Sequence, residues 1–210
     1  MAMFESSTPR FAESEALLRQ ATRVDSTSFV AWESLGLLEL VQGELRGAEQ
    51  SFAHALRVEP DNRDAIDGIA RADVGLKEPD AAIPYVDRLG TSDEEVLWSM
   101  GALLVERGRG PEAVKYLEEA AAQDRRAVGL ALLSMAYAQS DRVVDAVRTA
   151  AAATAAAGDT ASVFVVAGRA MLLAKRSSEA RGYLTRALAL DPTNDSARRG
   201  LATLEGAKPR

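Results

Sequence analysis

A pattern of small, aliphatic and aromatic residues occurs near both ends of the chain, and it constrains the fold more than any other feature. The first copy consists of Trp32, Leu35-Gly36, Ala48, Phe52, Ala55 and Pro60. The second copy consists of Phe164, Ala167-Gly168, Ala180, Leu184, Ala187 and Pro192. Apolar residues at intervals of three and four follow one face of a helix, and a proline stops it. The pattern predicts a unit of two helices that recurs along the chain.

This unit resembles the tetratricopeptide repeat, a helix–turn–helix motif with a period of about 34 residues. The resemblance implies an all-α fold, a right-handed superhelical solenoid of antiparallel helix pairs. About five repeats are expected, with an additional helix at each end. In such arrays each helix pair covers the apolar face of its neighbour.

The repeat length sets the expected boundaries. A flexible tail is expected at 1–9 and a single solenoid at 10–210. Within it we expect a half repeat at 10–28, complete repeats at 29–62, 63–93, 94–126, 127–160 and 161–194, and a capping helix at 195–207. Arg23-Val24-Asp25 precedes Arg57-Val58-Glu59 by one repeat length. The half repeat is therefore either a natural cap, which we favour, or the second half of a repeat in a longer array.

Small residues recur at one position of each expected helix, where a larger side chain would force paired helices apart. On first helices they are Gly36, Ala70, Gly101, Ser134, Gly168 and Ala202. On second helices they are Ala48, Ala82, Ala113, Ala146 and Ala180. The second helix of the fourth repeat has almost only alanine on its buried side, so we expect it to open more readily than its neighbours.

Charge is distributed unevenly along the chain. The net charge is −6, yet residues 43–124 contain 18 acidic and 9 basic residues, whereas residues 161–210 contain 4 acidic and 9 basic residues. A nucleic-acid-binding protein would present a broad basic face, so this class is disfavoured. The asymmetry fits attraction between copies, a partner of mixed charge, or simply solvated helix faces.

No residue set indicates catalysis, a metal site or a cofactor. The chain contains no cysteine and a single histidine, His54, which excludes disulfides, cysteine nucleophiles and zinc sites built from cysteine. Asp61, Asp64 and Asp67 are spaced as a helix start, where acidic residues are favourable, rather than as a calcium loop. Gly108 and Gly110 precede no phosphate-loop signature. We expect no enzyme activity and no cofactor.

The compartment expected from the sequence is the cytoplasm. The first ten residues lack the basic and apolar regions of a signal peptide, and no apolar run reaches the roughly 20 residues of a membrane helix. Frequent alanine and an excess of arginine over lysine suggest a GC-rich bacterial genome.

In tetratricopeptide repeats the first helices line a concave groove that generally binds peptides. The positions that the resemblance implies for this groove are Leu37, Leu40, Arg71, Trp98, Ala102, Met135, Val165, Arg169, Leu172 and Arg199. Trp98 and Met135 are the expected anchors, with burial of Trp98 between repeats as the alternative. The paired lysine and asparagine of chaperone-binding members are absent, since Leu37, Ala102 and Met135 occupy such places. A chaperone-tail role is therefore disfavoured.

The expected function is a non-catalytic interaction module that binds a peptide or helix of a partner protein in this groove. The partner is expected to be another protein, with neither nucleic acid nor membrane. One alternative is a self-assembling homo-oligomeric scaffold, in which the acidic middle of one copy meets the basic end of another. A second is the regulatory arm of an enzyme whose catalytic domain lies elsewhere.

Overall fold

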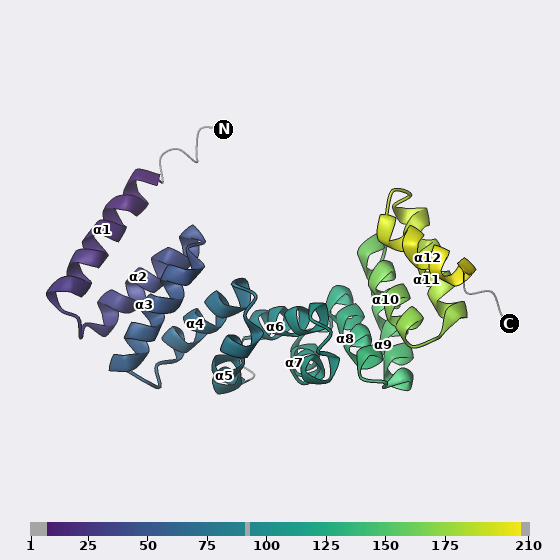
Figure 1. Ribbon diagram of the computed structural model, residues 1–210, viewed down its shortest axis with the longest axis horizontal. Coiled ribbons are helices and arrows are strands. Elements are labelled where there is room, and N and C mark those ends of the chain that lie inside the picture. Colours follow the sequence, from purple (N-terminus) through teal and green to yellow (C-terminus); the bar gives the residue numbers. More distant parts are fainter. Residues whose placement is uncertain (1–7, 91–92, 207–210) are drawn as a thin grey trace. The chain divides into compact units, whose positions relative to one another are not determined.

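The computed structural model describes residues 8–90 and 93–206, and these residues form twelve α-helices and no β-strand (Figure 1). The helices are α1 (Thr8–Val24), α2 (Phe29–Gln42), α3 (Leu45–Val58), α4 (Arg63–Gly75), α5 (Pro79–Leu89), α6 (Glu94–Glu106), α7 (Gly110–Gln123), α8 (Ala127–Gln139), α9 (Val143–Ala156), α10 (Ala161–Leu173), α11 (Ser177–Leu190) and α12 (Asp195–Gly206). The all-α repeat fold expected from the sequence is confirmed.

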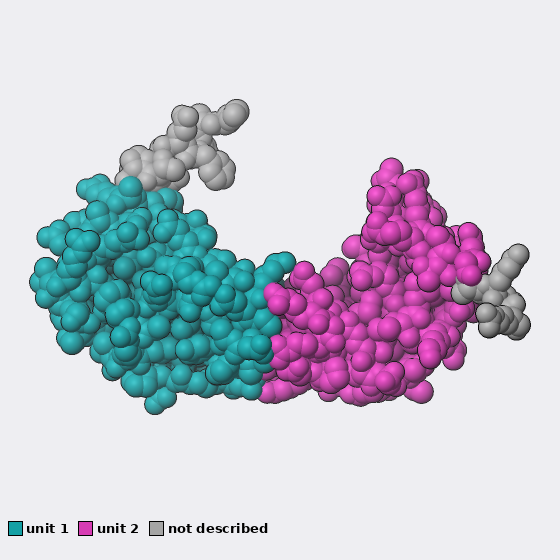
Figure 2. Space-filling view, in the orientation of Figure 1, with its two compact units in different colours: residues 1–96 teal, residues 97–210 magenta. Residues whose placement is uncertain are grey.

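The chain divides into two compact units, residues 1–96 and residues 97–210 (Figure 2). The single solenoid expected for 10–210 stays a prediction. The expected tail falls mostly on residues 1–7, outside the described residues, while Thr8 already belongs to α1. The last residue of the expected capping helix, position 207, also lies outside them, and α12 ends at Gly206.

In unit 1 consecutive helices pack together as α2 with α3 and α4 with α5 (Figure 1). The fully buried ring of Phe52 lies at the centre of this packing. A Cβ atom added to Gly36 would lie 3.0 Å from the ring, and one added to Gly68 would lie 2.3 Å from it. Glycine at these two positions therefore allows α2 and α4 to pack against one phenylalanine of α3.

The helices of unit 1 begin and end at residues with a clear local reason. Gly43 ends α2 in a left-handed conformation, with φ of 78°, and its N–H donates to backbone carbonyls of the last turn. Asn62 starts α4 by accepting hydrogen bonds from the N–H groups of Asp64 and Ala65. Pro79 starts α5, where its missing N–H costs little. These local signals fix where each helix of a pair turns back.

In unit 2 the expected small residues lie at close helix crossings. A Cβ atom at Gly101 would lie 2.3 Å from Leu117, and one at Gly168 would lie 2.7 Å from Leu184. At the crossing of α8 and α9, the buried Ser134 hydroxyl donates a 2.8 Å hydrogen bond to the carbonyl oxygen of Ala146. In each of these pairs, one face of the first helix packs against the second helix, and the opposite face remains for contacts outside the pair.

Candidate functional site: a groove along the first helices of unit 2

Three neighbouring cavities of unit 2 are lined by residues of the first helices α6, α8, α10 and α12 and of the turns beside them. The first, of about 390 Å³, is lined by Trp98, Ser99, Ala102, Arg126, Val128, Gly129 and Leu132. The second, of about 330 Å³, is lined by Ala102, Val105, Glu106, Gly108, Leu132, Met135, Gln139, Val166 and Arg169. The third, of about 300 Å³, is lined by Arg169, Leu172, Ser196, Arg199, Gly200 and Thr203. Shared residues join each cavity to the next, and we call the three together the first-helix groove.

Trp98 forms the wall of the first cavity, although only 5% of its surface is exposed. Its ring packs on Gly129, where an added Cβ atom would lie 2.4 Å from the ring. The guanidinium of Arg126 lies 5.2 Å from the ring centroid, in a cation–π contact. Trp98 is therefore held rigidly between α6 and α8 and presents only part of its ring to the groove.

Two apolar side chains of α8 line the middle of the first-helix groove. Leu132 lines both the first and the second cavity, and Met135 lines the second. The side-chain amide of Gln139 donates a 3.0 Å hydrogen bond to the carbonyl oxygen of Val105, which ties α8 to the end of α6. An apolar floor with fixed flanking helices suits burial of an apolar side chain.

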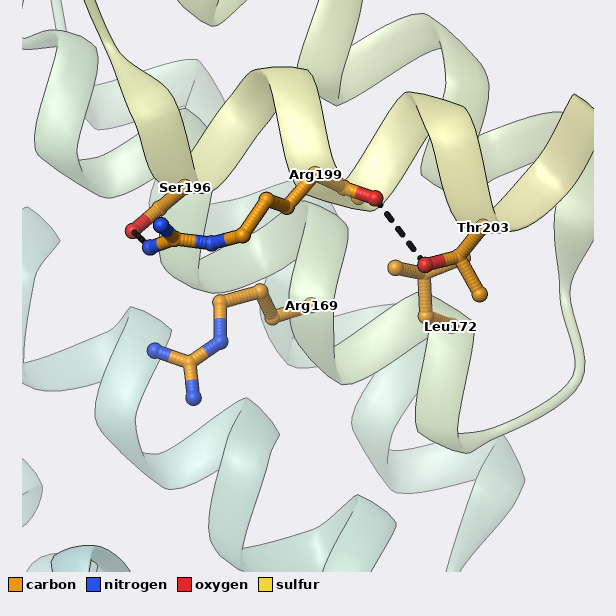
Figure 3. Close-up of a pocket in the computed structure, with 6 residues that line it drawn as sticks. Arg169, Leu172, Ser196, Arg199 and Thr203 are labelled. Carbon is orange, nitrogen blue, oxygen red and sulfur yellow. Dashed lines mark hydrogen bonds between the residues drawn. The ribbon is translucent and has the colours of Figure 1, made fainter.

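The far end of the groove, between α10 and α12, is cationic. Arg169 of α10 and Arg199 of α12 both line the third cavity, and Figure 3 shows their guanidinium groups on the same side of it. Arg199 donates a 3.3 Å hydrogen bond to the Ser196 hydroxyl, and the Thr203 hydroxyl donates a 2.9 Å hydrogen bond to the carbonyl oxygen of Arg199. Leu172 and Thr203 lie at the opposite side of the same cavity (Figure 3).

Six of the predicted groove residues line these cavities. They are Trp98, Ala102, Met135, Arg169, Leu172 and Arg199. Val165 is buried, and its neighbour Val166 lines the second cavity instead. Leu132 and Val128 also line the groove and were not among the predicted residues. Their positions, three and seven residues before Met135, follow helical spacing, but α8 is apolar on every side, so this spacing alone does not single them out.

The three predicted residues of unit 1 line none of the three cavities of the first-helix groove. The side chain of Leu37 is 49% exposed, whereas Leu40 packs against the apolar cluster around Phe52. Arg71 forms ion pairs with Asp67, at 2.6 Å, and with Asp93. Because two carboxylates already surround Arg71, it has little capacity left for a carboxylate from outside.

A separate cavity of about 360 Å³ lies among α1, α2 and α3 of unit 1. Trp32 and His54 line it and stack with their ring centroids 4.1 Å apart, and burial lowers the pKa of His54. The buried carboxylate of Glu39 accepts a 2.6 Å hydrogen bond from Ser51 and pairs with Arg19 at 3.4 Å. These partners satisfy the buried charge, so the network joins α1 to α2 and α3.

The described residues give no sign of a metal centre or a membrane span. Within 8–90 and 93–206 no three His, Cys, Asp or Glu side chains form a group that could hold a metal ion. Of the helices described, none is both long and apolar enough to cross a bilayer.

Comparison with solved structures gives the fold. YrrB, a TPR protein with an unusual peptide-binding site, superposes with a TM-score of 0.73 at 18% identity, over 88% of this chain and 97% of YrrB. The chain has a tetratricopeptide-repeat fold. MamA has a TM-score of 0.66 at 17% identity, over 78% of this chain and 92% of MamA. PilW, a type IV pilus biogenesis factor, has a TM-score of 0.65 at 17% identity, over 95% of this chain and 94% of PilW.

The tetratricopeptide-repeat likeness is a likeness of fold. No family model matches the sequence, and no curated protein matches it. At identities of 17 and 18%, the likeness shows the fold alone, and the ligand of the first-helix groove has to be argued from the side chains that line it in this chain.

Proposed function

We propose that this tetratricopeptide-repeat chain is a non-catalytic interaction module that binds a segment of a partner protein in the first-helix groove. The observation that carries the proposal is the continuity of three cavities along α6, α8, α10 and α12. A row of connected cavities can accept successive side chains of one extended segment or one face of a helix.

The energetics of the groove support binding rather than chemistry. Leu132, Met135 and Val166 offer apolar surface, and burying such surface contributes about 25 cal/mol per Å². The rigid Trp98 wall needs little ordering when a ligand binds, which lowers the entropic cost of association. YrrB, which has the same fold, is a protein with an unusual peptide-binding site. The cytoplasmic location stays a prediction, which cell fractionation would check.

Selection of peptides from a phage-displayed random 12-residue library on the full chain tests this proposal. Val128, which is 48% exposed, lines the Trp98 cavity, and V128D places a charge in the groove. We expect V128D to abolish binding of the selected peptides. Asp is favourable in the first turn of a helix, so the substitution should leave α8 folded.

Val144 offers a matched control. It is also the second residue of its helix, α9, and is 80% exposed, but it lines none of the three cavities. V144D should bind the selected peptides as the wild type does. Selection of no peptide, or peptides that bind V128D normally, would contradict the proposal.

A further inference from the structure

The two arginines of the third cavity distinguish the groove from a merely apolar surface. Arg169 and Arg199 come from different helices, α10 and α12, and line one cavity of about 300 Å³ (Figure 3). Two cations that face one small space repel each other, and a bound anion removes this repulsion. The geometry therefore favours an anionic group between them.

Within the described part of the chain, neither arginine has a carboxylate partner. Arg169 forms no ion pair there, and Arg199 bonds only the Ser196 hydroxyl through its side chain. Nearby arginines differ: Arg176 pairs with Glu179, and Arg198 pairs with Asp195 at 3.4 Å. The planar guanidinium of arginine can form two parallel hydrogen bonds to a carboxylate. Arg169 and Arg199 keep this capacity for a group from outside.

The cationic end continues directly into the apolar part of the groove. Arg169 lines the third cavity and also the second, where Met135 and Val166 face it. Leu132 then joins the second cavity to the Trp98 cavity. A single ligand can thus place an apolar side chain near Leu132 and an anionic group near Arg169.

The distance between the two ends sets the length of that ligand. Packed helices lie about 8–10 Å apart, so the two steps from α8 to α12 cover about 16–20 Å. An extended chain advances about 3.3–3.6 Å per residue, which gives a separation of about five or six residues.

The chemistry on the page distinguishes the occupants. A second copy of this chain would offer the acidic residues of 43–124 mostly on folded helices rather than on an extended segment. A nucleic-acid backbone would place phosphates along the whole groove, where Glu106 of the second cavity would repel them. An extended protein segment can place an anionic group at the arginine end of the groove and an apolar side chain at the Trp98 end, without a charge at every position between them.

We propose that the first-helix groove selects an extended segment of another protein that carries an apolar side chain and, about five or six residues away, side-chain carboxylates. The apolar side chain occupies the space between Trp98 and Leu132, and the carboxylates bind Arg169 and Arg199. This inference rests on the proposed function and adds the chemistry of the partner.

The test uses fluorescence anisotropy of labelled, C-terminally amidated 12-residue peptides with the full chain. One series carries leucine or phenylalanine and, four to seven residues away, two glutamates, and the matched series carries glutamines instead. Hydrogen bonds between two charged groups are stronger than those to a neutral amide, so we expect glutamate peptides to bind at least about ten-fold more tightly. R169Q/R199Q should remove this preference, so that glutamate and glutamine peptides bind the variant with equal affinity.

R148Q/R181Q is the matched control for charge. Both of its positions lie on second helices, α9 and α11, and the net charge changes by the same amount. This variant should keep the preference for glutamate peptides, because neither residue lines the three cavities and salt at 0.1 M screens exposed charges over a Debye length of about 10 Å. An equal loss in both double variants would overturn the proposal.

The remaining outcomes separate this inference from the proposed function. Peptides whose binding depends on Val128 but which show no preference for glutamate would overturn the carboxylate inference alone. The absence of any peptide binding that V128D abolishes would overturn both. A requirement for a free C-terminal carboxylate would overturn the assignment to side-chain carboxylates. Light scattering detects self-association. Self-association of the wild type that is lost in R169Q/R199Q would assign the groove to a second copy of this chain and overturn the proposal that a different protein occupies it.

Discussion

At the scale of single residues, Asp73 of α4 is a buried carboxyl group whose negative charge is poorly stabilised. Its surface is 1% exposed, and its Oδ1 atom has no hydrogen-bond partner among the described residues. Burial raises the pKa of Asp73 to about 6, and the negative charges of Glu49 and Glu78 add to the effect. The folded protein therefore holds the protonated form more firmly than the unfolded chain does.

The pH dependence of Asp73 follows from the direction of this shift. Its contribution to stability is fully present below the ordinary pKa of 3.8 and is lost as the pH rises through about 6. D73N cannot titrate, so the unfolding free energy of D73N minus that of the wild type should increase by about 2 kcal/mol from pH 4.5 to pH 7.5. Urea denaturation of both proteins at the two pH values measures it. A difference that does not change with pH would show that Asp73 is not perturbed.

The same scale shows where sequence reasoning about the groove stopped. Trp98, Ala102 and Met135 could be predicted because the repeat period assigns them to first helices, and all three line the groove. Leu132 could not be separated from its neighbours, because α8 is apolar on every side and has no polar face to fix its rotation. Burial of Trp98 depends on the gap left by Gly129, a contact between two helices that a single repeat does not reveal.

At the scale of helices, small residues set how closely the pairs approach. The sequence predicted this role for Gly36, Gly101 and Gly168, because each recurs at one place in the repeat, and the close contacts with Phe52, Leu117 and Leu184 agree. Gly68 lies outside that series yet makes one of the closest approaches, to Phe52. Its role follows from packing between successive pairs, which the recurring pattern does not encode.

Replacement of Gly68 by alanine tests this packing. The new Cβ atom would lie 2.3 Å from Phe52, which is fully buried and cannot move aside without disturbing the core, so G68A should lower the unfolding free energy by about 1–3 kcal/mol. The control is G182A in α11. A Cβ atom added to Gly182 would have no atom within 4 Å, so this substitution should raise the unfolding free energy, by at most about 1 kcal/mol. Urea denaturation measures both variants. Equal stability of the two would contradict this account of the crossing.

The alanine-rich helix α9 should be the least protected second helix of unit 2. Its buried residues are Ala146, Thr149, Ala150 and Ala153, whereas α7 buries Val114, Tyr116 and Leu117 among its residues. Smaller side chains bury less apolar area, so local opening costs less. Hydrogen exchange followed by mass spectrometry should show faster exchange in α9 than in α7. Equal or slower exchange in α9 would mean that area alone does not decide opening.

At the scale of the whole molecule, the fold class was predictable because it depends on repetition rather than on any one contact. The pattern of Trp32 to Pro60 returns in Phe164 to Pro192, and each copy has helices at these places, α2 with α3 and α10 with α11. The division into two units was not predicted. Local periodicity describes each helix pair equally well and contains no information on where contacts between pairs become fewer.

In unit 2, two of the basic residues that make the charge of the chain uneven lie in the first-helix groove. The basic residues of 161–210 include Arg169 and Arg199, which line one cavity without a carboxylate partner among the described residues. Several arginines elsewhere form exposed ion pairs within the chain, such as Arg142 with Asp145 at 2.8 Å, which contribute little to stability. The proposed recognition of an acidic segment therefore depends on these two residues rather than on the net charge.

The central claim is that a partner segment lies along the first helices of unit 2. Hydrogen exchange of the full chain with and without a saturating selected peptide tests it most directly. We expect slower exchange in α6, α8, α10 and α12 and unchanged exchange on the outer faces of α7, α9 and α11. Protection confined to the second helices, or to unit 1, would contradict the account.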